Sequence, residues 1–265
     1  MNRVVYAVTR RLALWLSYIR LNSLQKTTVD GRVCFVKTRR RITRFLIPPG
    51  NLLMRITGGR SEVLGESEWR DWERRVFEAY EAGPKALLHK GDGDSLDTLL
   101  RSKSCEPDER LLAIRLALRA LKALHQRQVA WDDGQVRSLS HGDATCMNVS
   151  VDLSQQTATW FDFDTRHRRE ISELDRFTDD YRALIFSAAC VLDESLYPSL
   201  AELCWECIPK TQGKHFQALL DTAGQRTTLF ELAQAPLTRK QLCRLLEALS
   251  SRHREVAQKT RGLLE

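Results

Sequence analysis

The residues best suited to chemistry lie in one loop and at the end of one apolar run. The loop contains His141, Gly142 and Asp143, and Asn148 follows five positions after Asp143. Asp162 comes fourteen residues later, in a Trp-Phe-Asp-Phe-Asp sequence. A carboxylate and an amide oxygen suit a hard divalent cation, and a second carboxylate can take the proton of an attacking hydroxyl group. This order predicts phosphoryl transfer, with Asp143 catalytic, Asn148 and Asp162 binding the metal, and His141 bracing the loop.

A lysine earlier in the chain completes this set. Lys37 follows an apolar, β-prone run, and its ammonium group would contact the phosphates of a nucleotide. A helix glutamate would hold that ammonium group in place. We favour Glu73, because apolar residues follow it at +3, +4 and +7, and Glu68 is the rival. The predicted cofactors are therefore ATP, bound through Lys37 and Glu73, and Mg²⁺.

A predicted hairpin positions the lysine. Asp30 and Gly31 separate two β-prone runs, residues 27–29 and 32–37, and this pair favours a tight turn with positive φ. The basic stretch 38–44 after the second strand is expected to be a solvated or phosphate-facing loop. The Pro-Pro-Gly sequence at 48–50 is expected to break the chain.

A second predicted hairpin positions the acids. Residues 149–151 and 158–161 are β-prone runs with a polar segment between them. Their pairing would bring Asn148 back beside Asp162.

The remaining elements are mostly helical, and together they predict the fold class. Helices are expected over 67–82, 96–101 with Ser95 as N-cap, 107–127, 184–192 and 237–264, with a short strand over 86–88. The order predicts an α+β protein in which a small β-rich lobe precedes a larger helical lobe. The predicted units are an amphipathic helix over 1–22, an N-lobe over 23–97 and a C-lobe over 98–265.

Composition narrows the partners. The 265 residues are 43% hydrophobic and 28% charged, as in ordinary globular proteins, and the net charge is +7. A basic balance favours anionic partners such as nucleotides, phosphorylated sugars or acidic lipids. Nucleic acid is not expected, because the basic stretch 38–44 has no interleaved aromatic residues. Seven cysteines, an odd number, indicate reduced thiols, and Cys204 and Cys207 are expected to be buried on a helix rather than to bind zinc.

The first residues predict a helix with two alternative roles. Arginines interrupt the apolar run over 3–20, so it is too broken to span a bilayer, and no cleavage site follows it. The helix could pack on the protein, or it could lie on an anionic membrane surface. We therefore expect a cytoplasmic protein, with peripheral contact at the inner face of a membrane as one option.

These motifs resemble those of known enzymes. The H-G-D-x4-N loop, followed by an apolar strand ending in F-D-F, resembles the aminoglycoside phosphotransferase group of kinase-like enzymes. Residues 31–37, 63–65 and 176–187 are similar to segments of bacterial lipopolysaccharide core kinases, which act on Kdo or heptose. The resemblance covers residues 27–190.

The resemblance implies a two-lobed protein-kinase-like fold, ATP with magnesium, and a hydroxyl acceptor on a heptose or Kdo sugar. It also implies that Asp179 or Asp180 hydrogen-bonds the catalytic loop. The expected reaction is transfer to a sugar of a lipid-linked glycan, and a cytosolic aminoglycoside-type phosphotransferase is the nearest alternative. No G-x-G-x-x-G loop precedes Lys37, which leaves a nucleotide-binding pseudokinase or scaffold as the alternative from another class.

Overall fold

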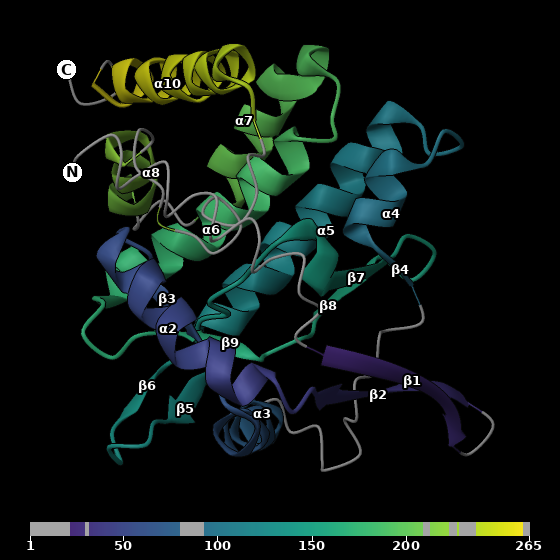
Figure 1. The fold of residues 1–265 in the computed structure, drawn as a ribbon. Coiled ribbons are helices and arrows are strands. Elements are labelled where there is room, and N and C mark those ends of the chain that lie inside the picture. Colours follow the sequence, from purple (N-terminus) through teal and green to yellow (C-terminus); the bar gives the residue numbers. More distant parts are fainter. Residues whose placement is uncertain are drawn as a thin grey trace.

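The computed structural model describes residues 22–29, 32–79, 93–208, 213–222, 227 and 237–261. In these ranges the protein is mixed α+β, mostly helical with small antiparallel sheets, so the predicted α+β class is confirmed. Figure 1 shows most of the helices in its upper half, with the hairpins β1–β2 and β5–β6 and helix α3 below them.

Both predicted hairpins are present. Strands β1 (Asn22–Val29) and β2 (Arg32–Arg39) pair antiparallel, although the expected turn at 30–31 lies outside the described residues. Strands β7 (Val149–Asp152) and β8 (Thr157–Trp160) form the second hairpin. Lys37 lies near the end of β2, and the second hairpin begins just after Asn148 and ends two residues before Asp162.

The expected chain break at 48–50 is wrong, because helix α2 (Thr43–Ile56) runs through both prolines. Prolines inside a helix remove two backbone donors, which would otherwise bond to the carbonyls of Arg44 and Phe45. Both of these residues are exposed, so water can replace the lost bonds. The basic stretch 38–44 is likewise not one loop, because β2 ends at Arg39 and α2 begins at Thr43.

Short strand pairs join segments that are distant in sequence. Strand β3 (Ser61–Val63) pairs with β9 (Thr165–His167), which follows the two aspartates of the F-D-F-D sequence. Strand β4 (Asp94–Ser95) adds to β7. These two pairings hold residues 61–63 and 94–95 beside the segments that flank Asn148 and Asp162. A third pair, β5 (Gln128–Ala130) with β6 (Val136–Ser138), lies after α5.

The helices form the core. Their bounds are α3 (Glu66–Ala79), α4 (Leu96–Arg101), α5 (Pro107–His125), α6 (Glu173–Ala189), α7 (Tyr197–Cys207), α8 (Gly213–Asp221) and α10 (Arg239–Arg261), with 3-10 turns η1 (Cys146–Asn148) and η2 (Glu194–Leu196). Ser95 caps α4 as predicted, accepting from the Thr98 N–H. The helix predicted over 184–192 corresponds to α6, which begins earlier, at Glu173, and ends at Ala189. All residues of α6 from Arg176 onward are buried. It is the buried helix against which the loop at 141–148 packs.

Some predictions fall outside the described residues, namely most of the helix over 1–22 and the strand over 86–88. Cys204 and Cys207 are both buried on α7, as expected. Within the described ranges, no helix combines the length and the apolar character needed to cross a bilayer. The division at 97–98 stays a prediction.

Candidate functional site

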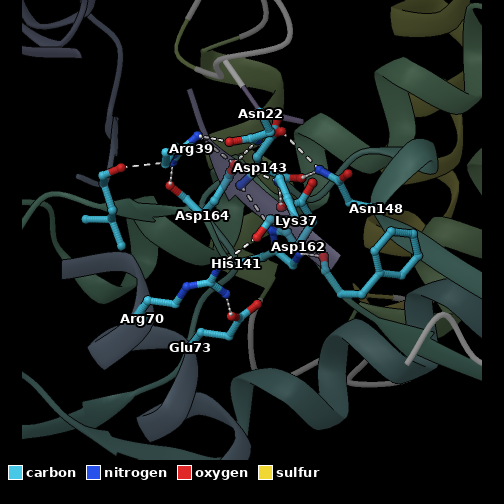
Figure 2. Close-up of polar contacts among 12 residues, drawn as sticks. Asn22, Lys37, Arg39, Arg70, Glu73, His141, Asp143, Asn148, Asp162 and Asp164 are labelled. Atoms are coloured by element: carbon cyan, nitrogen blue, oxygen red, sulfur yellow. Dashed lines mark hydrogen bonds and ion pairs between the residues drawn. The ribbon is translucent and has the colours of Figure 1, made fainter. Parts of the chain in front are cut away.

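The predicted lysine and the predicted metal-binding aspartate meet in the structure. The Nζ of Lys37, near the end of β2, donates to Asp162, which follows β8. The same Nζ donates to Asp164 Oδ2 at 2.7 Å. Figure 2 shows these carboxylates gathered around the ammonium group. The hairpin β1–β2 and the segment after β8 thus build one site from residues 125 positions apart.

Asp164 has a group of partners that sequence reasoning missed. Arg39 Nη1 and Asn22 Nδ2 each donate to Asp164 Oδ2 at 3.0 Å. Arg39 also donates to the backbone carbonyls of Leu64 and Asp164. A signal for Arg39 was present, because it lies two residues after Lys37 on a strand and so shares its face. Asn22 is the residue paired with Arg39 in the β1–β2 register.

The loop residues Asp143 and Asn148 contact each other directly. Asn148 Nδ2 donates to the backbone oxygen of Asp143 at 2.8 Å and to its Oδ2 at 3.0 Å. The Phe161 N–H donates to the Asn148 carbonyl at 3.0 Å. This bond extends the second hairpin and brings Asn148 beside the strand end that carries Asp162, as predicted.

His141 braces the loop as predicted, and its role is structural. Its Nε2 lies 2.8 Å from the Phe161 carbonyl, and its Nδ1 accepts the Asp143 N–H at 3.3 Å. Burial lowers the pKa of this imidazole, so the ring is neutral with its proton on Nε2. Both nitrogens are therefore engaged with backbone, and neither is available as a base.

Asp180 anchors the same loop from helix α6. Its Oδ2 accepts the His141 N–H at 2.8 Å, its Oδ1 accepts the Gly142 N–H at 2.9 Å, and His125 Nε2 lies 3.0 Å from Oδ2. Burial would raise the pKa of this carboxyl group, but the histidines around it, His167 first, hold the pKa at about 2. Of the two acids that the resemblance suggested, Asp180 holds the loop.

Asp179 instead contacts His167 at 3.3 Å and the Thr227 hydroxyl group.

Gly142 cannot be replaced without moving the backbone. Its φ is +85°, and a Cβ there would lie 2.8 Å from the Cα of Arg166 on β9. Only glycine combines this conformation with so close an approach. The β9 backbone therefore fixes the position of the residue just before Asp143.

The predicted ion pair between Lys37 and Glu73 is not formed in the structure, where both residues have other partners. Lys37 binds the two aspartates, and Glu73 Oε2 lies 3.6 Å from Arg70 Nη1 on its own helix. Of the two predicted glutamates, Glu68 is exposed and accepts the Gly65 N–H. The Glu73 side chain is buried, its Oε1 has no hydrogen-bond partner, and burial raises its pKa to about 7. It is an unsatisfied acceptor beside the site.

The site carries more negative charge than its cations neutralise. Burial, together with Asp164 and Asp162, raises the pKa of Asp143 to about 7. Burial and Asp164 raise the pKa of Asp162 to about 6. Burial would also raise the pKa of Asp164, but Lys37 and Arg39 lower it below its ordinary value. Asp162 shares the ammonium group of Lys37 with Asp164, and Asp143 accepts from the neutral Asn148 amide, so the cations of the site only partly offset the effect of burial on these two acids.

The backbone at Asp162 supports a functional role for its side chain. Its φ is +68°, a left-handed conformation that is uncommon for residues other than glycine, although Asp adopts it more readily than most. Strained conformations of this kind persist where the surroundings enforce them, and they are concentrated at functional sites.

The donor set fits a magnesium ion that is shared with a ligand. Asp162 supplies a carboxylate, and Asn148 supplies an amide oxygen, since its nitrogen is used toward Asp143. No three His, Cys, Asp or Glu side chains in the described ranges form a metal cage by themselves. Mg²⁺ is typically held by one or two protein carboxylates and by substrate phosphates, so an incomplete cage is the expected arrangement.

Comparisons with protein-family models, with curated proteins and with solved structures gave no match for this chain. The functional argument therefore depends on the residues and geometry of the site.

Proposed function

We propose that this protein is an ATP- and Mg²⁺-dependent phosphotransferase with a two-lobed kinase-like fold, acting on a sugar hydroxyl group. The observation that carries the proposal is the convergence of Lys37, Asp143 and Asp162 from three segments, with two carboxylates left short of positive charge. A magnesium nucleotide would bring the positive charge of its cation to these carboxylates, and its phosphates would accept the donors of Lys37.

Each residue then has a defined task. Asp143 accepts or orients the proton of the acceptor hydroxyl group, and its pKa near 7 suits a base at neutral pH. Asp162 and Asn148 would hold Mg²⁺, which when bound supplies charge neutralisation at the transferred phosphoryl group. Lys37 would donate to the phosphates and orient them for in-line transfer. Asp180 and His141 keep the loop rigid, so that Asp143 is held at one position.

Glu73 gives Lys37 an alternative partner during nucleotide binding. When Asp162 takes up a cation, it becomes a weaker partner for the ammonium group. The unsatisfied Oε1 of Glu73 can then accept from Lys37, as the sequence suggested. The proposed ion pair thus belongs to the nucleotide-bound state, and its formation would lower the pKa of Glu73 from about 7.

The acceptor that we propose is a sugar of a lipid-linked, lipopolysaccharide-core-like glycan, at the inner face of the bacterial membrane. The basic net charge of +7 supports an acceptor that carries acidic or phosphate groups. A cytosolic aminoglycoside-type acceptor would react with the same residues of the protein. The experiment below therefore distinguishes the two acceptors.

The experiment measures transfer of γ-labelled phosphate from ATP to bacterial sugar and lipid extracts, with product mass as the readout. Wild-type protein is compared with Asp162→Asn, with and without Mg²⁺. We expect a labelled sugar product only from the wild type with Mg²⁺. A labelled aminoglycoside in place of a glycan would change the acceptor class. ATP binding without any turnover in either protein would identify a pseudokinase or scaffold and overturn the proposal.

A further inference from the structure

Helix α2 carries an apolar stripe that faces solvent. The large side chains of Ile42, Phe45, Leu52 and Ile56 are 57%, 65%, 59% and 58% exposed, and Pro49 is exposed between them. Their spacing of 3, 4, 3 and 4 residues places them on one face of the helix. A contiguous apolar face on the outside of a protein marks a binding surface more often than isolated exposed residues do.

The opposite face of α2 is fixed to the protein, so the stripe is held outward. Asn51 Oδ1 accepts the Val63 N–H and Asn51 Nδ2 donates to the Val63 carbonyl, both at 2.9 Å. Thr43 is buried at the start of the helix. Figure 1 shows α2 at the edge of the molecule, beside β3.

The basic residues around the stripe indicate what kind of partner it binds. Residues 31–61 contain no Asp or Glu. Arg40, Arg41 and Arg44 are exposed where α2 begins, and no acidic side chain in the described ranges pairs with them. Arg44 lies over the Phe45 ring at 4.6 Å, which places a cation beside an exposed aromatic residue. An apolar stripe with a basic flank matches an anionic lipid surface, where apolar groups insert and arginines meet phosphates.

We propose that the α2 stripe docks this protein on an anionic lipid bilayer. The helix lies in the interface, because its 14 residues extend only about 21 Å and cannot cross the hydrocarbon core. A second copy of this chain fits the surface less well, because two α2 faces would bring their arginines together without compensating acids.

Docking by α2 would place the lipid surface next to the proposed active site. The helix begins four residues after Arg39, whose guanidinium group holds Asp164. A sugar attached to a lipid would then lie near Asp143. This last step rests on the proposed function, whereas the binding of lipid by α2 does not.

The test is flotation of the full-length protein with vesicles of phosphatidylcholine alone and with vesicles containing about one third phosphatidylglycerol. The variant Phe45→Ser/Leu52→Ser/Ile56→Ser removes the stripe, and we expect its binding to the anionic vesicles to fall by at least about tenfold. Val136→Ser is the matched control, because Val136 is 64% exposed on β6 and lies outside the stripe; its binding should equal wild type. Thermal unfolding of each variant confirms that exposed substitutions leave the fold intact.

The arginines give a second, independent readout. Arg41→Gln/Arg44→Gln should weaken binding to anionic vesicles and reduce its dependence on salt, with little effect on neutral vesicles. Wild-type flotation that the stripe variant retains in full would overturn the proposal, as would absence of wild-type binding. A wild-type dimer without vesicles that the stripe variant dissociates would assign the surface to a second copy instead. None of these flotation measurements uses ATP. Their outcome therefore tests lipid binding by α2 even if the protein has no kinase activity.

Discussion

The acids in and around the loop at His141 fall into two groups, and their ionisation differs. Asp143 and Asp162 have pKa values raised to about 7 and about 6, whereas the pKa of Asp180 is held at about 2. Asp180 is fully buried, whereas Asp143 and Asp162 are half-buried, so burial alone would raise the pKa of Asp180 the most. The difference lies in their partners, and it distinguishes a group that awaits a ligand from one that is already satisfied.

Asp180 accepts two backbone N–H groups and contacts a histidine, so every oxygen has a donor. Asp143 has the Asn148 amide, and its pKa is raised further by two neighbouring carboxylates. A protein gains nothing in stability from the second arrangement, because like charges in a partly dry site repel each other. Such a group is retained where a ligand or a reaction uses it.

The largest effect that we predict is on turnover through Asp143. Asp143→Asn should lower kcat by about 10²–10⁴-fold, because the acceptor hydroxyl group loses its base while Mg²⁺ ligation is left in place. Steady-state transfer of labelled phosphate measures the loss. Asp133→Asn is the control, since Asp133 is an exposed loop aspartate paired with Arg137. Turnover of Asp143→Asn within a few-fold of wild type would remove Asp143 from the chemistry.

The next effect concerns stability through Asp180. Asp180→Asn should destabilise the protein by about 3 kcal/mol or more, because an amide nitrogen would face a backbone N–H in a buried position. Urea unfolding measures the loss, with the exposed Asp71→Asn on α3 as the control that should change little. A similar cost for Asp143→Asn would contradict the contrast between the two groups.

The residues of the candidate site could largely be predicted from sequence, but the difference in ionisation could not. The H-G-D-x4-N spacing, the two hairpins and the α+β order gave Lys37, Asp143, Asn148 and Asp162, because these features are local in the chain or joined by short turns. The role of His141 as a brace also followed from the loop motif. The brace and the pairing of Asn148 with the strand end are confirmed.

The rest depends on contacts between distant segments. Glu73 was predicted to bind Lys37, but Asp164 competes for the ammonium group and its position depends on the β3–β9 pairing. Helix α2 was missed because two prolines mark a break by local rules, whereas an exposed position lets water satisfy the freed carbonyls. Both outcomes depend on tertiary packing and solvent exposure, which a single sequence does not display.

A smaller effect is the pH dependence of stability without Mg²⁺. The pKa of Asp143 is about 7 when folded and near 3.8 when unfolded, so the folded state binds more protons between these values. The free energy of unfolding therefore decreases as pH rises from about 4 to 7 and levels off above. Asp143→Asn should remove this part of the pH dependence. It should also stabilise the metal-free protein at pH 8 by about 1–2 kcal/mol, which is less than the whole pKa shift corresponds to, because the side chain is partly exposed.

Unfolding by urea at pH 5, 6, 7 and 8 in the presence of a chelator gives the slope. Adding Mg²⁺ with nucleotide to the wild type should flatten it, because a bound cation favours the ionised carboxylates. A slope that is identical in wild type and Asp143→Asn would mean that other groups, such as Glu73 with its raised pKa, account for the pH dependence.

The smallest predicted effect tests whether Asp164 belongs with the satisfied or the unsatisfied acids. Asp164 lies in the site, but its pKa is lowered and it accepts from Lys37, Arg39 and Asn22. Asn22→Ala removes one donor to Asp164 and one acceptor of Arg39, and it should cost about 1 kcal/mol in urea unfolding, because the two cations remain. A loss as large as that of Asp180→Asn would mean that the hairpin β1–β2 depends on this residue for its position. A loss near 1 kcal/mol, with an unchanged KM for ATP, would mean that the cations suffice to hold Asp164, so that the charge deficit of the site lies on Asp143 and Asp162.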